Sequence, residues 1–239
     1  DGFTYQGGTG TDTTDDYSIG DSYLFSNVGN DGTNNIDAVV TIVDFYNSAA
    51  VDPENPVGAE LPSLSNFGLD YSPGGAANND WLPVLNNMPG TNFIYSATYK
   101  LEFFISGTTT ALTVDTNLTV FDLDSEGDGT FGSESIKVTA PTVSVVVAGG
   151  TDLPADGSTA GTVVGTNPGT LLDYEVFYEN GQTSIQMDSI PGAATNQFDY
   201  DEHWAATFQV EGASEFLIEA IVNVGSSGST LSRATGMHF

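Results

Sequence analysis

The densest group of side chains able to do chemistry lies between Phe121 and Glu134, in the sequence FDLDSEGDGTFGSE. Five carboxylates fall within thirteen residues, and glycines stand where the backbone must turn sharply. The five are Asp122, Asp124, Glu126, Asp128 and Glu134. Hard oxygen donors on a tight loop suit Ca²⁺, which takes about six to eight oxygens in a forgiving geometry. The sequence therefore predicts a Ca²⁺ site in this stretch.

The spacing is close to the calcium loop of EF-hands, D-x-D-x-[DN]-G-x₅-E, but differs from it at two places. Glu126 stands where Asp or Asn is usual, and Glu134 comes one residue late. Because no helical pattern flanks the stretch, we expect a loop between strands. The alternative is a solvated acidic hairpin without a metal. Asp31, Asn35 and Asp37 form another acidic group, for which a solvated loop is the expectation.

The charge balance limits the environment and the partners. The chain has 32 acidic residues, no cysteine and only three cations, Lys100, Lys137 and Arg233, which gives a net charge of −29. In a folded chain with this charge the carboxylates repel one another and destabilise the fold unless salt or divalent cations screen them. The chain lacks the basic surface of a nucleic-acid binder. The composition is typical of extracellular or cell-surface proteins exposed to brine; the alternative is a cytosolic protein of a halophile.

Catalytic chemistry has little support in the sequence, and we expect no enzyme and no catalytic residues. The two histidines, His203 and His238, match neither a nucleophile-elbow triad nor the H-E-x-x-H zinc spacing. A glycoside hydrolase needs only two carboxylates about 5–10 Å apart, so it stays open as a third alternative. Trp81, in a loop, is the aromatic residue expected to contact a glycan if the chain binds carbohydrate.

The elements that must position these residues are strands. Short runs rich in Val, Ile, Thr, Phe and Tyr are separated by Gly, Pro, Asn and Asp, which predicts an all-β, antiparallel, jelly-roll-like β-sandwich. Turns are expected at residues 115–116 and at Asn180 and Gly181, a tight-hairpin pair. The expected strands are residues 22–26, 37–46, 93–106, 117–123, 134–140, 142–147, 171–178, 184–190, 203–210, 215–224 and 231–239.

The chain is expected to form one domain over residues 1–239, with one long loop insertion. Residues 52–90 contain six prolines and predict a long connection, with one helical turn near residues 81–85. Residues 149–169 are rich in Gly and Thr and mark a weak boundary. We keep one domain because each half alone would have a thin core. No run of about 18 apolar residues exists, so no membrane span is expected.

The N-terminal segment is a candidate for assembly between copies. Residues 1–20 are rich in Gly and Thr, and Phe3 and Tyr5 would point to the same side of an extended strand. Such a strand can pair with the sheet edge of a neighbouring copy, and contacts of this kind build filaments. The alternative is that the segment folds back on its own sheet. We expect the chain to be a whole small secreted protein.

Two stretches resemble strand pairs of secreted bacterial and archaeal cell-surface β-sandwich modules, found in calcium-dependent adhesins and extracellular filament subunits. The first is GDSYLFSNV at residues 20–28 followed by NIDAVVTI at residues 35–42. The second is LTVFDLD at residues 118–124, with Glu134 opening the next strand. The resemblance implies extracellular placement, calcium-dependent rigidity and a binding or structural role.

Together these patterns predict an extracellular structural or adhesive protein that binds Ca²⁺ and forms a homo-oligomer or homopolymer. The first alternative is a carbohydrate-binding module.

Overall fold

The computed structural model describes residues 4–7, 19–48, 67–70, 82–88, 93–121, 125–126, 132–147, 151–153, 163–166, 172–189, 206–225, 231–234 and 236–238. Within these residues every regular element is a strand, and every strand pairing is antiparallel. The predicted all-β antiparallel sandwich is therefore confirmed. No helix in the described part of the chain is long and apolar enough to cross a membrane.

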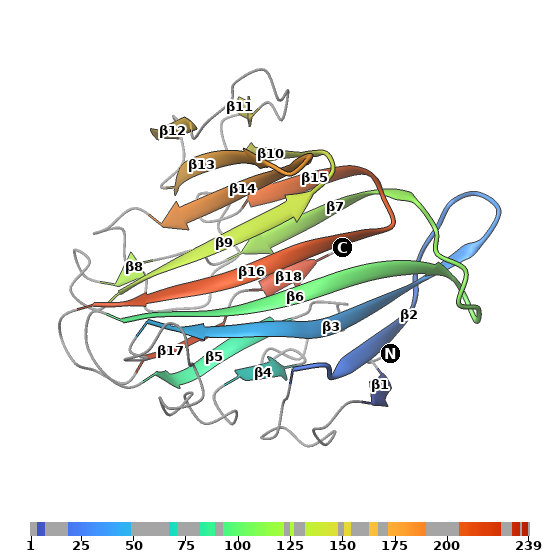
Figure 1. Ribbon diagram of the computed structural model, residues 1–239, viewed down its shortest axis with the longest axis horizontal. Coiled ribbons are helices and arrows are strands. Elements are labelled where there is room, and N and C mark those ends of the chain that lie inside the picture. The colour runs from blue at the N-terminus through green and yellow to red at the C-terminus, as the bar shows by residue number, and fades with distance from the viewer. Residues whose placement is uncertain are drawn as a thin grey trace.

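A ten-stranded sheet forms one layer of the sandwich and faces the viewer in Figure 1. Nine of its strands follow one another in a continuous path, and the tenth, β8 (Ser125–Glu126), pairs with β9 beside that path. The order along that path is β1 (Thr4–Gly7), β2 (Ser22–Asn30), β3 (Asn35–Asn47), β6 (Phe93–Ile105), β16 (Glu215–Val224), β9 (Gly132–Ala140), β14 (Gln182–Ser189), β13 (Leu172–Glu179) and β12 (Val163–Thr166).

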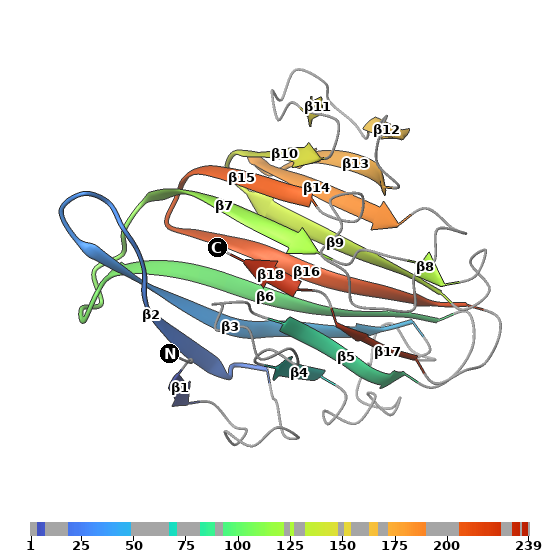
Figure 2. The ribbon, with the colours of Figure 1, turned by 180° about the vertical axis from the view of Figure 1, so that it is seen from behind.

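Two smaller sheets form the second layer, which Figure 2 shows from its own side. The five-stranded sheet has the order β11 (Thr151–Leu153), β10 (Val143–Val147), β15 (Ala206–Ala213), β7 (Val114–Phe121) and β18 (Gly236–His238). The three-stranded sheet has the order β17 (Leu231–Ala234), β5 (Leu82–Met88) and β4 (Phe67–Asp70). Because β17 and β18 are separated only by Thr235, the chain crosses directly from one small sheet to the other.

The core lies between the layers because alternate residues of the large sheet point inward. In β6 the buried side chains include Tyr95, Tyr99, Leu101 and Phe103, whereas their neighbours along the strand are mostly less buried. Strands β16 and β9 show the same period of two. Burial of such side chains contributes about 1.5–3 kcal/mol each, which makes this interface the main source of stability.

Most predicted strands are confirmed, and so is the tight hairpin between β13 and β14. Asn180 and Gly181 have φ angles of 55° and 77°, the left-handed pair that a two-residue hairpin turn requires. Strand pairing also joins the regions on either side of residues 149–169. Strand β9 pairs with β14, and β10 pairs with β15.

Three expectations about local structure are wrong. The predicted turn at residues 115–116 lies inside β7, because the chain turns earlier, at Ser106 and Gly107. The predicted helical turn near residues 81–85 is replaced from Leu82 on by β5, which pairs with β4 of the same connection and with β17 near the end of the chain. The predicted strand at 231–239 is divided between β17 and β18, which lie in different sheets.

Candidate functional site

The predicted calcium region connects the two layers of the sandwich. Strand β7 ends at Phe121 in the five-stranded sheet, and β9 begins at Gly132 in the ten-stranded sheet. Between them, β8 pairs with the start of β9, with Ser125 opposite Ser133 and Glu126 opposite Gly132. Strand β8 therefore places Glu126 opposite Gly132, two residues from Glu134 along β9.

Of the five predicted ligands, the structure describes the side chain of one. Glu134 is 2% exposed and lies on the inner side of β9 with Ile136 and Val138. Glu126 is placed by its backbone, whereas Asp122, Asp124 and Asp128 lie outside the described residues. In the part of the chain that the structure describes, no group of three or more His, Cys, Asp or Glu side chains gathers as a metal site.

The donor chemistry of this end nevertheless fits a hard cation. Glu134 brings carboxylate oxygens to the inner side of β9, next to the strand that carries Glu126. Oxygen donors of this kind are the ligands that Ca²⁺ prefers.

Asp37 holds a junction that the sequence pattern did not predict. Its Oδ1 accepts a hydrogen bond from the backbone N–H of Asn27 at 2.9 Å, and its Oδ2 accepts one from Gly107 at 3.0 Å. Burial of Asp37 opposes ionisation, but these bonds and one from the Ser106 side chain lower its pKa below the usual range. Asp37 therefore fastens the irregular part of β2, where Asn27 has φ 57°, to the turn that follows β6.

The carboxylate of Asp31 also accepts hydrogen bonds within the fold. Its Oδ1 accepts hydrogen bonds from the backbone N–H groups of Asn34 at 2.6 Å and Thr33 at 2.7 Å. These bonds lower the pKa of Asp31. The expectation of a merely solvated loop at Asp31 and Asp37 is thus incomplete, since both carboxylates shape the ends of the β2–β3 hairpin.

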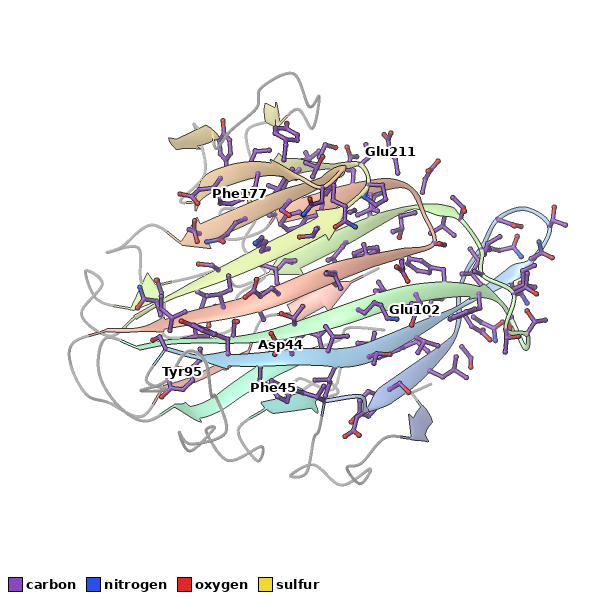
Figure 3. All side chains as sticks on the ribbon, viewed as in Figure 1. Asp44, Phe45, Tyr95, Glu102, Phe177 and Glu211 are labelled. Carbon is purple, nitrogen blue, oxygen red and sulfur yellow. The ribbon has the colours of Figure 1, made fainter. Side chains whose placement is uncertain are left out.

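A polar groove of about 360 Å³ lies on the five-stranded sheet, across β7 and β15. The residues around it are Asp115, Thr116, Asn117, Gln209, Val210 and Glu211. Strand β15 has an irregular register between Val210 and Ala213, and the Gly212 N–H donates to Asp115 Oδ1 at 2.8 Å. This irregularity turns Glu211 outward at the end of the sheet, as Figure 3 shows. The groove offers amide and carboxylate groups and was not predicted as a site.

The candidate assembly strand pairs within its own chain in the structure. Strand β1 lies at the edge of the ten-stranded sheet, with Thr4 opposite Leu24 and Tyr5 opposite Tyr23 of β2. Phe3 and the glycan candidate Trp81 lie outside the described residues. Strand donation and glycan contact by Trp81 therefore stay predictions.

No protein-family model matches the chain, and no curated protein matches its sequence. Among solved structures, the fold is similar to the crystal structure of the N-terminal domain of the Streptococcus gordonii adhesin Sgo0707, with a TM-score of 0.50 at 12% identity. The similarity covers 93% of this chain and 49% of that one, so the chain spans about half the length of its structural neighbour. At this identity the comparison shows a shared sandwich fold.

Proposed function

We propose that this chain is an extracellular structural or adhesive protein that Ca²⁺ stabilises and that assembles with copies of itself. The observation that carries the proposal is the sandwich fold shared over 93% of the chain with a domain of a bacterial adhesin. The charge of −29 and the absence of cysteine support an environment rich in salt, as outside a cell.

Calcium has a specific part in the proposal. Glu126 and Glu134, with Asp122, Asp124 and Asp128 between β7 and β9, would hold the ion where the chain passes from one layer to the other. The bound ion supplies positive charge that offsets carboxylate repulsion there. Pairing of β8 with β9 holds the backbone of Glu126 beside the start of β9.

Strand donation is the proposed route of assembly. Strand β1 is a short edge strand, and fourteen residues lie between its end at Gly7 and the start of β2 at Ser22. A connection of this length is compatible with the same pairing being made with β2 of a neighbour. Heterologous contacts of this kind give filaments when the rotation between copies does not close a ring.

Deleting residues 1–16 tests the proposal. We expect the truncated chain to stay folded, because the core strands begin at β2, but to sediment as a smaller species than the full chain. The matched control replaces residues 1–16 with a Gly/Ser segment of equal length. If the truncated and full chains form the same assembly, or if the full chain stays single at high concentration, strand donation is wrong.

Carbohydrate binding is the second candidate, and the polar groove on β7 and β15 favours it. Its amide and carboxylate groups can exchange hydrogen bonds with sugar hydroxyls. A glycan array separates the two candidates. The carbohydrate-binding role would come first if the chain does not assemble and if glycan binding is lost in Asn117→Ala and in Gln209→Ala. Glycan binding that is retained after Trp81→Ala would exclude Trp81 from the contact.

A further inference from the structure

The tip of the β13–β14 hairpin carries the only Asn-Gly pair of the chain, Asn180 and Gly181. The side-chain amide of an asparagine can be attacked by the backbone nitrogen of the residue that follows it. Glycine obstructs this attack least, because it has no Cβ and its backbone rotates most freely. By sequence, Asn180 is therefore the asparagine whose amide is most open to attack by its own backbone.

The fold leaves both reacting groups uncovered. Asn180, Gly181 and Gln182 are all exposed, and the strand ladder closes where Glu179 lies opposite Gln182, so the two turn residues lie outside it. A Cβ placed on Gly181 would meet no heavy atom within 4 Å. Among the described residues, no hydrogen bond holds the Asn180 side chain or the N–H of Gly181. Rotation can therefore bring the nitrogen to the side-chain carbon without breaking a contact.

A second turn in the described part of the chain has the same spacing but is protected. Asp31 precedes Gly32, and an aspartate can be attacked in the same way. The N–H of Gly32 donates to Asn30 Oδ1 at 2.7 Å, which holds the attacking nitrogen. The N–H groups of Thr33 and Asn34 hold Asp31 Oδ1 at 2.7 and 2.6 Å, and they lower its pKa. The carboxyl group therefore stays ionised, and an ionised carboxylate resists a nucleophile.

We infer that Asn180 is a site of spontaneous deamidation. The Gly181 nitrogen loses its proton to hydroxide and bonds to Asn180 Cγ. The Cγ–Nδ2 bond breaks, and Nδ2 takes up a proton and leaves as ammonia. Water then opens the cyclic imide at one of its two carbonyl carbons, and the ring nitrogen regains its proton. Opening at Cγ gives aspartate, and opening at the backbone carbon gives isoaspartate. Water is the only reactant consumed, and nothing is oxidised or reduced.

The two products affect the hairpin differently. Each adds a carboxylate next to Glu179, in a chain whose net charge is already −29. Aspartate keeps the main chain intact and tolerates a left-handed φ such as the 55° of Asn180. Isoaspartate adds a methylene to the main chain of a two-residue turn, which then no longer fits the pairing of Glu179 with Gln182. Isoaspartate therefore loosens the end of the hairpin, whereas aspartate leaves it paired.

Peptide mapping by mass spectrometry tests the inference on the folded full chain, incubated at several pH values in heavy-oxygen water. We expect the peptide that contains Asn180 to lose one amide nitrogen and gain one solvent oxygen before any other asparagine reacts. The rate should rise about tenfold per pH unit, because the deprotonated fraction of the Gly181 nitrogen rises by that factor. Chromatography of this peptide separates the aspartate product from isoaspartate.

Two variants make the test specific to the turn. Asn180→Gly removes the amide but keeps a residue that adopts the left-handed turn, so the reaction should vanish while the circular dichroism spectrum stays the same. Gly181→Ala keeps the amide but places a Cβ beside the attacking nitrogen, so the rate should fall about tenfold. The matched control is Asn117, which is also exposed but precedes Leu118 and should keep its amide.

Unfolding the chain in urea tests the contribution of the fold. Asn180 should react in the folded chain within about tenfold of its rate in urea, because an exposed turn opens locally at little cost in free energy. Asp31 should form isoaspartate in urea and not in the folded chain, where its hydrogen bonds protect it. An Asn180 amide that survives in the folded chain but reacts in urea, or that reacts no faster than Asn117, would overturn the inference.

Discussion

At the scale of single residues, Asp37 makes the clearest contribution to stability. Replacing Asp37 with Ala leaves the N–H groups of Asn27 and Gly107 without their acceptors. We expect the free energy of unfolding at neutral pH to fall by about 2–4 kcal/mol, as measured by urea denaturation. Asp44→Ala is the control, because exposed Asp44 accepts from the N–H of its sequence neighbour Phe45, and it should change stability little.

The lowered pKa of Asp37 also gives a pH dependence with a definite sign. A carboxyl whose pKa is lower in the folded state stabilises the protein above its unfolded pKa of about 3.9. That stability is lost as the pH falls through the folded value. The difference in stability between the native chain and Asp37→Asn should therefore be full at neutral pH and shrink below about pH 4. A difference that is constant across this range would show that Asp37 does not act through its charge.

At the scale of elements, the β13–β14 hairpin tests how far local turn chemistry fixes the register. Gly181 has a φ of 77°, which a β-branched residue adopts only with strain. Gly181→Val should lower the free energy of unfolding by about 1–3 kcal/mol. Gly29→Ala is the control, since the added Cβ would lie in ordinary contact, 3.7 Å from Ile36 Cδ1. Equal effects in the two variants would mean that the turn conformation carries no cost.

The connection between β7 and β9 is the element through which Ca²⁺ should act. Binding to the folded state alone stabilises by RT ln(1 + [L]/Kd), about 2.7 kcal/mol at a hundredfold excess over Kd. We expect millimolar Ca²⁺ to raise the melting temperature at fixed ionic strength, and Asp122→Ala with Asp124→Ala to abolish the shift. Mg²⁺ at the same concentration serves as the control for general screening. A melting temperature that does not respond to Ca²⁺ would contradict the site.

At the scale of the whole molecule, strand positions could be predicted but their partners could not. Alternation of apolar residues marked β6 and β16 because each has one face on the core. The insertion of β16 between β6 and β9 depends on pairing between residues far apart in the sequence, from Leu217 with Thr139 to Val224 with Phe93, and such pairing has no local signal. Strand β5 was missed because Pro83 and its neighbours carry turn signals, which the pairing with β4 and β17 overrides. The bonds of Asp37 likewise exist only after folding brings Gly107 beside it.

The net charge of −29 predicts that salt stabilises the whole molecule even with calcium bound. Screening shortens from about 10 Å at 0.1 M ionic strength to about 3 Å at 1 M. The melting temperature should therefore rise with NaCl in saturating Ca²⁺, and also as the pH falls toward the isoelectric point near 4.1. A melting temperature that is flat across the salt series would mean that the carboxylates are too far apart to repel one another.

The central claim is that this chain builds an extracellular assembly, and electron microscopy of the purified full chain tests it most directly. The grids are prepared at high salt, with millimolar Ca²⁺ and with a chelator. We predict filaments or sheets of a repeating particle in Ca²⁺, with fewer or shorter ones after chelation. Separate single particles both in Ca²⁺ and in chelator, at every protein concentration tested, would contradict the claim.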